Sequence, residues 1–298
     1  MFTKLAVGAL ALASISTPTS PGRLDAIAPS VLVETCGGKY GWEDPAPPVH
    51  VHGDTYYVGT CGISSLLIVS LAGHVLIDGG TEKNVKFIAA NIERLGYRLR
   101  DIEYILNSHE HYDHTGAIKE LQRVTGAKIV ALAASKPMLE AGHSFRDDPQ
   151  LDLLKPFPAF HVDRVIVDGD SVRLGKLKLT AHSTPAHSPG STSWTWQSCE
   201  QGKCIRIAYA DSLTIPVDKD YRLLNHPEHV AEFRAALRKV AALPCDLLIT
   251  PHPNVSGFFD RLSGRAPLID GTGCAAYAAR GAANLDAQLK SEQAPAAK

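Results

Sequence analysis

The chain has 298 residues, 45% of them hydrophobic and 20% charged, which is enough apolar material for one large core and excludes a disordered or fibrous protein. Its formal net charge is -1, so the chain offers no broad positive field for nucleic acid or for an anionic membrane. We therefore expect neither as a partner.

The N-terminus has the pattern of an export signal. Lys4 supplies a positive charge, residues 5–15 are almost entirely apolar, and residues 16–21 are polar and helix-breaking. The apolar run is too short to span a bilayer. We expect a signal peptide within residues 1–20, with the cleavage site left open, and a single periplasmic or secreted domain over residues 21–298. The alternative, a buried N-terminal helix, is disfavoured because the polar stretch would separate it from the rest of the chain.

Strand-like and helical patterns alternate in the first half of the chain. Residues 82–95 carry apolar side chains at helical spacing and are followed by Gly96, a common helix-terminating residue; residues 117–124 form a second, shorter helical pattern. Short apolar or β-branched runs of strand length occur at residues 55–58, 64–70, 74–77, 104–106 and 128–131.

The second half repeats this alternation. A helical pattern covers residues 228–242, and the tail beyond Leu289 is expected to fray. Strand-like runs occur at residues 164–167, 171–174, 177–182, 191–197, 205–209 and 247–250. Strands and helices in both halves imply an α/β fold in which two sheets pack face to face with helices outside, a four-layer sandwich.

Six cysteines in an exported chain predict three disulfides, although six cysteines allow 15 pairings. Cys199 and Cys204 bracket a short turn between two strand-like runs, which favours a bridge that closes a hairpin. Order along the chain does not decide the remaining two pairs, but it is consistent with Cys36 paired to Cys61 and Cys245 paired to Cys274.

A histidine-rich segment, residues 108–116, follows the strand-like run at residues 104–106 and precedes a helix. Four of its side chains within six positions are good metal ligands: His109, His111, Asp113 and His114. Imidazole nitrogen and carboxylate oxygen suit zinc, and a strand-to-helix loop can aim neighbouring side chains in different directions. The pattern predicts two adjacent ions, one near His109 and His111 and one near Asp113 and His114.

One loop cannot complete two coordination shells, so further ligands must come from elsewhere. His187 lies within a Pro- and Gly-rich turn, and His252 comes just after the strand-like run at residues 247–250. Taken alone, either histidine is explained about equally well by a structural role. Lone histidines elsewhere are expected at the surface or in the core, namely His50, His74, His143 and His226.

These motifs together resemble the metallo-β-lactamase superfamily, whose fold is an αββα sandwich, and within it most closely the third subclass of the class B β-lactamases. The extra cysteines are similar to those of certain exported members of that subclass. Other subclasses place a cysteine where this chain has Ser212, and no cysteine occurs between Cys204 and Cys245. The resemblance covers roughly residues 56–252, and its matching segments are residues 53–59, 76–80, 108–116, 183–191 and 209–213.

The resemblance also implies roles for single residues. The first zinc ion would be bound by His109, His111 and His187, and the second by Asp113, His114 and His252. Asp113 would in addition orient the attacking water. Ser212 would hydrogen-bond that water or the substrate, and Thr214 matches a position near the substrate carboxylate. Ala186, where many relatives have glycine, is a departure beside a ligand that concerns loop geometry alone.

The activity implied by the resemblance is hydrolysis of a β-lactam antibiotic, and hence antibiotic resistance, by attack of a metal-bound hydroxide. The partner is then a small molecule, and we expect a monomer. One alternative is a lactonase or thioesterase of the same superfamily, in which Asp211 would bridge the two metals. The other is a periplasmic zinc-binding protein without catalysis. Asp78, which precedes two glycines, is expected either to form a turn or to support a ligand histidine.

Overall fold

The computed structural model describes residues 27–293, so the expected signal peptide and the last five residues lie outside the described part. Among the described residues, two sheets account for every strand. The first sheet has seven strands in chain order: β1 (Val49–His52), β2 (Thr55–Tyr57), β3 (Leu66–Ser70), β4 (Gly73–Ile77), β5 (Ile102–Leu106), β6 (Lys128–Leu132) and β7 (Arg164–Ile166). It is antiparallel from β1 to β4 and parallel from β4 to β7.

The second sheet has five strands and differs in order from the chain. Its order is β12 (Leu247–Ile249), β11 (Lys203–Tyr209), β10 (Thr192–Glu200), β9 (Leu177–Ser183) and β8 (Ser171–Leu174). Strand β12 pairs in parallel with β11, whereas the other pairs are antiparallel.

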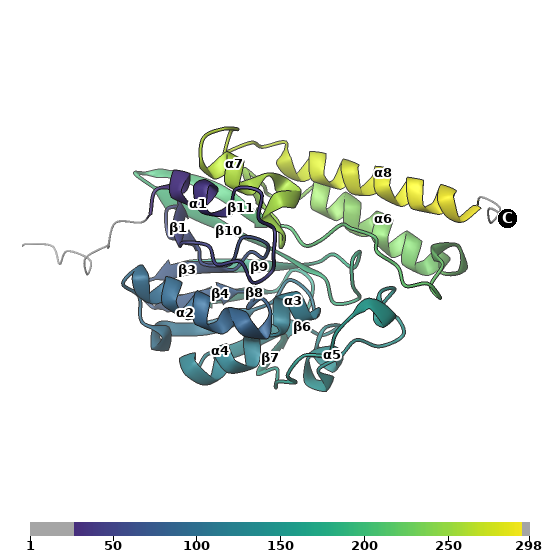
Figure 1. Cartoon of the computed structure of the whole chain (residues 1–298), viewed down its shortest axis with the longest axis horizontal. Helices are drawn as coiled ribbons and strands as arrows, with labels where there is room; N and C mark the ends of the chain where they lie inside the picture. Colours follow the sequence, from purple (N-terminus) through teal and green to yellow (C-terminus); the bar gives the residue numbers. More distant parts are fainter. Residues whose placement is uncertain (1–26, 294–298) are drawn as a thin grey trace, which may run out of the picture.

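Helices connect and cover these sheets (Figure 1). The α-helices are α1 (Pro29–Cys36), α2 (Val85–Arg94), α3 (Tyr112–Thr115), α4 (Ile118–Thr125), α5 (Lys136–Ala141), α6 (Pro227–Ala241), α7 (Phe258–Leu262) and α8 (Gly273–Gln293). Short 3-10 helices are η1 (Glu82–Asn84), η2 (Leu99–Asp101), η3 (Leu151–Leu153), η4 (Leu223–Asn225) and η5 (Pro253–Ser256). Among the described residues, no helix is both long and apolar enough to cross a membrane.

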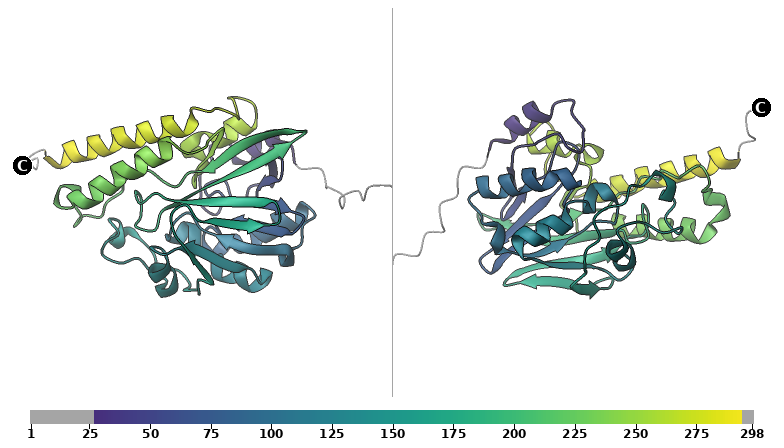
Figure 2. Two further views of the ribbon diagram at one scale, coloured as in Figure 1. Left: turned by 180° about the vertical axis from the view of Figure 1, so that it is seen from behind. Right: turned by 60° about the horizontal axis from the view of Figure 1, so that its bottom comes forward.

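Three apolar clusters separate four layers, as the sequence predicts. The first lies between the sheets and includes both Trp194 and Trp196 of β10. The second packs α2 and α4 onto the outer face of the first sheet. The third packs α6 and α8 onto the second sheet, and Figures 1 and 2 show these two helices side by side on the outside of the molecule. The αββα sandwich is therefore confirmed.

Most predicted elements are confirmed within a few residues of their bounds, but six of the described α-helices and strands were not predicted: α1, β1, α3, α5, α7 and α8. The largest omission is α8, whose apolar residues are mostly alanines and give a weak helical period. The expectation that the chain frays beyond Leu289 is wrong for the described residues, because α8 continues to Gln293. The helix as a whole is stabilised by packing on α6 rather than by a strong amphipathic pattern of its own.

All three predicted disulfides are present. Cys36 pairs with Cys61, Cys199 with Cys204, and Cys245 with Cys274. The Cys199–Cys204 bridge joins directly opposed residues of the β10–β11 hairpin, as its spacing indicated. The other two bridges tie α1 to the loop before β3 and tie the start of α8 to the residue two positions before β12.

Candidate metal centre

The histidine-rich loop turns from the end of β5 into the short helix α3. His109 lies in the loop, and His111 is the N-cap residue of α3 with an extended backbone. Asp113 and His114 follow on the first turn of that helix. This change from loop to helix points consecutive side chains in different directions, and all four of these side chains are buried. This backbone geometry is compatible with the predicted two sets of ligands from one loop.

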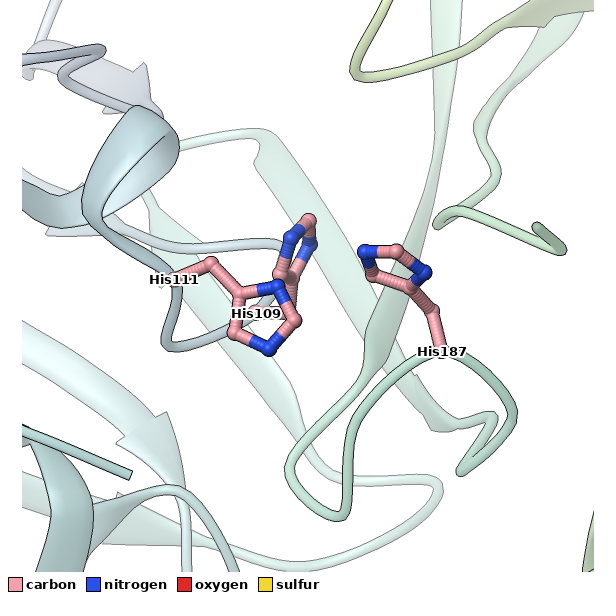
Figure 3. A group of neighbouring side chains, drawn as sticks. All are labelled: His109, His111 and His187. Carbon is pink, nitrogen blue, oxygen red and sulfur yellow. The ribbon is translucent and has the colours of Figure 1, made fainter. Parts of the chain in front are cut away.

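His187 joins the loop from the connection between β9 and β10. The ring centroids of His109 and His111 are 4.7 Å apart. The ring centroid of His187 lies 4.8 Å from that of His109 and 4.9 Å from that of His111. One nitrogen from each ring lies within 4.8 Å of the others, so these three residues could hold a metal ion. We call them the first donor group; Figure 3 shows the three rings gathered from two separate loops.

His109, Asp113 and His114 form a second donor group, whose ligand atoms also lie within 4.8 Å of one another. The structure places His252 beside this group, with its Nε2 3.4 Å from Asp113 Oδ2 and its ring centroid 5.2 Å from that of His114. His114 Nε2 lies 3.2 Å from the same Asp113 oxygen. The six side chains proposed as metal ligands from sequence therefore lie together.

Each of the five imidazoles is held through one ring nitrogen. His109 Nδ1 donates to Asp211 at 2.8 Å, His111 Nε2 to Asp148 at 2.9 Å, His114 Nδ1 to Asp78 at 3.1 Å, His187 Nδ1 to the Thr214 carbonyl at 3.2 Å, and His252 Nδ1 to the Gly62 carbonyl at 3.0 Å. Metal-binding histidines are commonly oriented in this way by a carboxylate or carbonyl.

The second nitrogen of each ring is the one that could bind a metal, although that of His187 also lies 3.4 Å from Gln150 Nε2. His109 Nε2 is fully buried and has no hydrogen-bond partner anywhere in residues 27–293. A buried polar atom without a partner is costly, so its position among other nitrogen donors fits a site built for a cation. The donor chemistry, imidazole nitrogen with one carboxylate, fits zinc.

The electrostatics of the centre keep three of the donors, His109, His187 and Asp113, in forms that bind metal. Burial, together with the neighbouring histidines, lowers the pKa of His109 and of His187 well below the usual range, so both rings are neutral near pH 7. Burial opposes ionisation of Asp113, but His114 and His252 hold the pKa of that carboxyl well below its usual value. Neutral imidazole and ionised carboxylate are the ligand forms of these groups. Burial lowers the pKa of the other two buried imidazoles, but neighbouring carboxylates outweigh it, so the pKa of His111 is raised and that of His114 is raised to about 10.

Asp78 supports the centre from beneath the histidine-rich loop. Its carboxylate accepts hydrogen bonds from the backbone N–H of Ser108 at 2.6 Å, from the Tyr209 hydroxyl at 2.7 Å and from His114. Asp78 also has a φ of 60°, a backbone conformation that is uncommon outside glycine and that its side-chain bonds help to maintain. The hydrogen bond to His114 agrees with one of the two expectations for Asp78, support of a histidine proposed as a ligand, whereas residues 78–80 form no turn.

Asp211 Oδ1 accepts a hydrogen bond from Nδ1 of His109. Asp211 therefore contacts the side of the His109 ring opposite to Nε2, the nitrogen that could bind a metal. Within the described residues, neither donor group includes Asp211. This placement differs from the alternative in which Asp211 bridges two metals. Ser212 is buried next to it, and the exposed Thr214 has its Oγ1 3.0 Å from His187 Nδ1. Thr214 therefore contacts a ligand histidine directly, which the sequence did not indicate.

The loop that contains Asp148 and Gln150 contributes contacts that the sequence analysis missed. Asp148 accepts from His111, as described above, and from the backbone N–H of Gln150 at 2.9 Å. Gln150 Nε2 donates to the backbone carbonyl of His187 at 2.9 Å. The only signal in the sequence was two adjacent aspartates before a proline in a long loop, which does not say which histidine they meet.

Comparison with known proteins places the chain in a family. The sequence pattern of the Metallo-beta-lactamase superfamily matches residues 58–200. The structure of MIM-1, a metallo-beta-lactamase from Novosphingobium pentaromativorans, is 50% identical with a TM-score of 0.88, covering 90% of this chain and 100% of that one. MEM-A1, a subclass B3 metallo-beta-lactamase from a soil metagenome library, is 40% identical with a TM-score of 0.81, covering 85% of this chain and 98% of that one.

A curated relative has a different named activity. The hydroxyacylglutathione hydrolase of Rhodospirillum rubrum is 30% identical over 107 residues, 36% of this chain. The match spans only 33% of that relative's own length. The full-length similarity to MIM-1, the matching sequence pattern and the αββα sandwich agree, and the chain belongs to the metallo-beta-lactamase superfamily.

Proposed function

We propose that this chain is an exported β-lactamase that uses two zinc ions to hydrolyse the amide bond of a β-lactam antibiotic. The observation that carries the proposal is the convergence of five imidazoles, each held through one nitrogen by a carboxylate or carbonyl, and the carboxylate of Asp113 on two donor groups that share His109. Similarity to a metallo-beta-lactamase over 90% of the chain supports the choice of substrate.

The ligands are assigned by the two donor groups and their neighbour. His109, His111 and His187 would hold the first zinc ion; Asp113, His114 and His252 would hold the second. His109 belongs to both donor groups by distance, so its buried Nε2 lies between them. Bound zinc would supply a Lewis acid that lowers the pKa of water and polarises a carbonyl oxygen.

The chain's own residues orient the reactants. Hydrolysis adds a hydroxyl group to the lactam carbonyl carbon, breaks the C–N bond and leaves a proton on the nitrogen. Asp113 is ionised near pH 7 and can accept a hydrogen bond from the attacking water, which orients it. Ser212 would hydrogen-bond the water or the substrate, and Thr214, an exposed residue, would lie near the substrate carboxylate.

Export is part of the proposal. Three disulfides leave no free cysteine among the described residues. Disulfides persist in oxidising compartments, so these bridges agree with the export signal expected in residues 1–20 and with a periplasmic or secreted enzyme.

The test is hydrolysis by the purified, zinc-loaded protein. We expect it to hydrolyse nitrocefin and a carbapenem, to lose this activity in a zinc chelator and to regain it when zinc is restored. The same preparation is assayed on a hydroxyacyl-glutathione thioester and on an N-acyl homoserine lactone. For every substrate that the protein hydrolyses, activity should be lost in the chelator and regained with zinc to the same extent, because one metal centre would act on all of them.

Two outcomes would contradict the proposal. A higher kcat/KM for the thioester or the lactone would favour the second candidate, a thioesterase or lactonase, which the similarity to hydroxyacylglutathione hydrolase supports. Binding of zinc without turnover of any substrate would favour a non-catalytic zinc-binding protein.

A further inference from the structure

Glu110 is a fully buried carboxylate that none of the roles above uses. It lies in the chain between His109 and His111, two members of the first donor group. Its Oε1 accepts a hydrogen bond from the backbone N–H of Gly190 at 2.9 Å. Gly190 follows His187 in the β9–β10 loop, so this single bond joins the two loops that supply the first donor group.

A second bond joins the same loops on the other side of His109. The backbone carbonyl of Ser108 accepts from the N–H of Thr192 at 2.6 Å. The two residues flanking His109 therefore both bind the segment that follows His187. Of these two contacts, only the one from Glu110 depends on a side chain.

The fit around Gly190 shows that this contact is built closely. A Cβ atom at this position would lie 2.4 Å from Glu110 Oε2 and 2.2 Å from Ser135 Oγ. Such distances are far below van der Waals contact, so only glycine lets the loop approach Glu110 this closely. Ser135 Oγ also donates to the Gly190 carbonyl at 2.9 Å.

We propose that Glu110 is a positioning residue for the metal centre: by accepting from the Gly190 N–H, it sets the distance of His187 from His109 and His111. This inference rests on the proposed ligand roles but not on the substrate. A residue that only fills space would act through its volume, whereas a positioning residue acts here through its hydrogen-bond acceptor. Substitutions of similar size separate these two roles.

The test compares Glu110→Gln with Glu110→Met. Glutamine keeps an oxygen acceptor for Gly190, whereas methionine has a similar volume and no such acceptor. Affinity is measured on metal-free protein by competition between Zn²⁺ and a chromophoric chelator, and the coordination geometry by the visible spectrum of the Co²⁺-loaded protein. Neither readout depends on turnover of any substrate.

We expect Glu110→Met to weaken the binding of one metal equivalent by about 10- to 100-fold, the usual effect of removing a residue that orients a ligand, and to change the Co²⁺ spectrum. Glu110→Gln should keep most of the affinity and the spectrum, even though its buried amide lowers stability. Ser135→Ala is the matched control, because Thr192 Oγ1 also donates to the Gly190 carbonyl at 2.9 Å and no bond of Glu110 is lost.

Wild-type affinity in Glu110→Met would overturn the inference, and so would equal losses in the methionine and glutamine variants. Should Glu110→Met not fold, Gly190→Ala disturbs the same contact from the other loop, and wild-type affinity in that variant would also overturn it. A protein that fails to hydrolyse β-lactams but shows the expected pattern of affinities would contradict the proposed function alone.

Discussion

The orientation of each histidine in this centre is fixed by a carboxylate or carbonyl that binds the ring nitrogen on the side away from the donor groups. Asp148 is the clearest case, because it is fully buried and accepts from the Nε2 of His111 at 2.9 Å. Its contact leaves Nδ1 of His111 for the metal. An imidazole that loses such a partner can rotate or change tautomer, which weakens its bond to a metal.

Asp148→Ala should therefore lower zinc affinity by about 10- to 100-fold, as judged by competition with a chromophoric chelator. Asp147 is the adjacent residue, has the same charge and is exposed, so Asp147→Ala is a matched control that should leave the affinity unchanged. Equal affinities in the two variants would show that His111 does not depend on Asp148 for its orientation.

The segment after β11 is held by an element that lies far away in the sequence. Tyr277 on α8 is buried, and its hydroxyl accepts from the Leu213 N–H at 2.9 Å and donates to the Asp211 carbonyl at 3.1 Å. One hydroxyl thus bonds the backbone on both sides of Ser212. The same segment orients His109 through Asp211, so α8 supports the centre without contributing a ligand.

Tyr277→Phe should keep the packing of α8 and lower the free energy of unfolding by about 1–3 kcal/mol, because the buried Leu213 N–H loses its partner. It should also lower kcat/KM for the proposed reaction, because Ser212 and Asp211 shift with their backbone. Urea denaturation and steady-state kinetics measure the two effects.

Tyr56→Phe serves as the control for this prediction. Tyr56 is also buried, and its hydroxyl accepts from Tyr97 in a part of the first sheet that contributes no ligand. It should lose some stability and keep kcat/KM. A Tyr277→Phe enzyme with unchanged kcat/KM would show that α8 stabilises the fold but does not position the site.

At the scale of the whole molecule, the proposed metal ligands come from both halves of the sandwich. The histidine-rich loop follows β5 of the first sheet, whereas His187 and His252 follow β9 and β12 of the second. A bound metal therefore links segments that the polypeptide keeps more than 60 positions apart, as the numbers of His114 and His187 show. Metal that binds only the folded state must stabilise it.

Zinc at 100 times its dissociation constant should add about 2.7 kcal/mol to the free energy of unfolding and raise Tm, and a chelator should remove this gain. His187→Ala should lose much of the zinc-dependent rise in Tm. His143→Ala, which changes an exposed histidine outside both donor groups, should keep it. A Tm that does not respond to zinc in the wild-type protein would contradict metal binding by the folded chain.

Local patterns were sufficient for much of this molecule. Apolar runs and turn residues predicted every strand of the two sheets except β1, together with three helices, because a half-buried element must repeat its apolar side chains with its own period. The cluster from His109 to His114 was equally visible, since neighbouring ligands on one loop are neighbours in sequence. Helix α8 was missed because alanines give little contrast between its faces.

The tertiary structure alone decided which partner each histidine meets. Asp148 lies 37 positions from His111, and Asp211 lies 102 positions from His109. Other contacts that support the centre are as distant in the chain: Glu110 lies 80 positions from Gly190, and Tyr277 lies 64 positions from Leu213. Nothing in a linear sequence pattern specifies such pairs. Sequence by itself determined the layers and the kinds of donor atom, because periodicity and residue chemistry are local properties. The orientation of those donors is a product of packing between distant segments, and only the folded chain contains it.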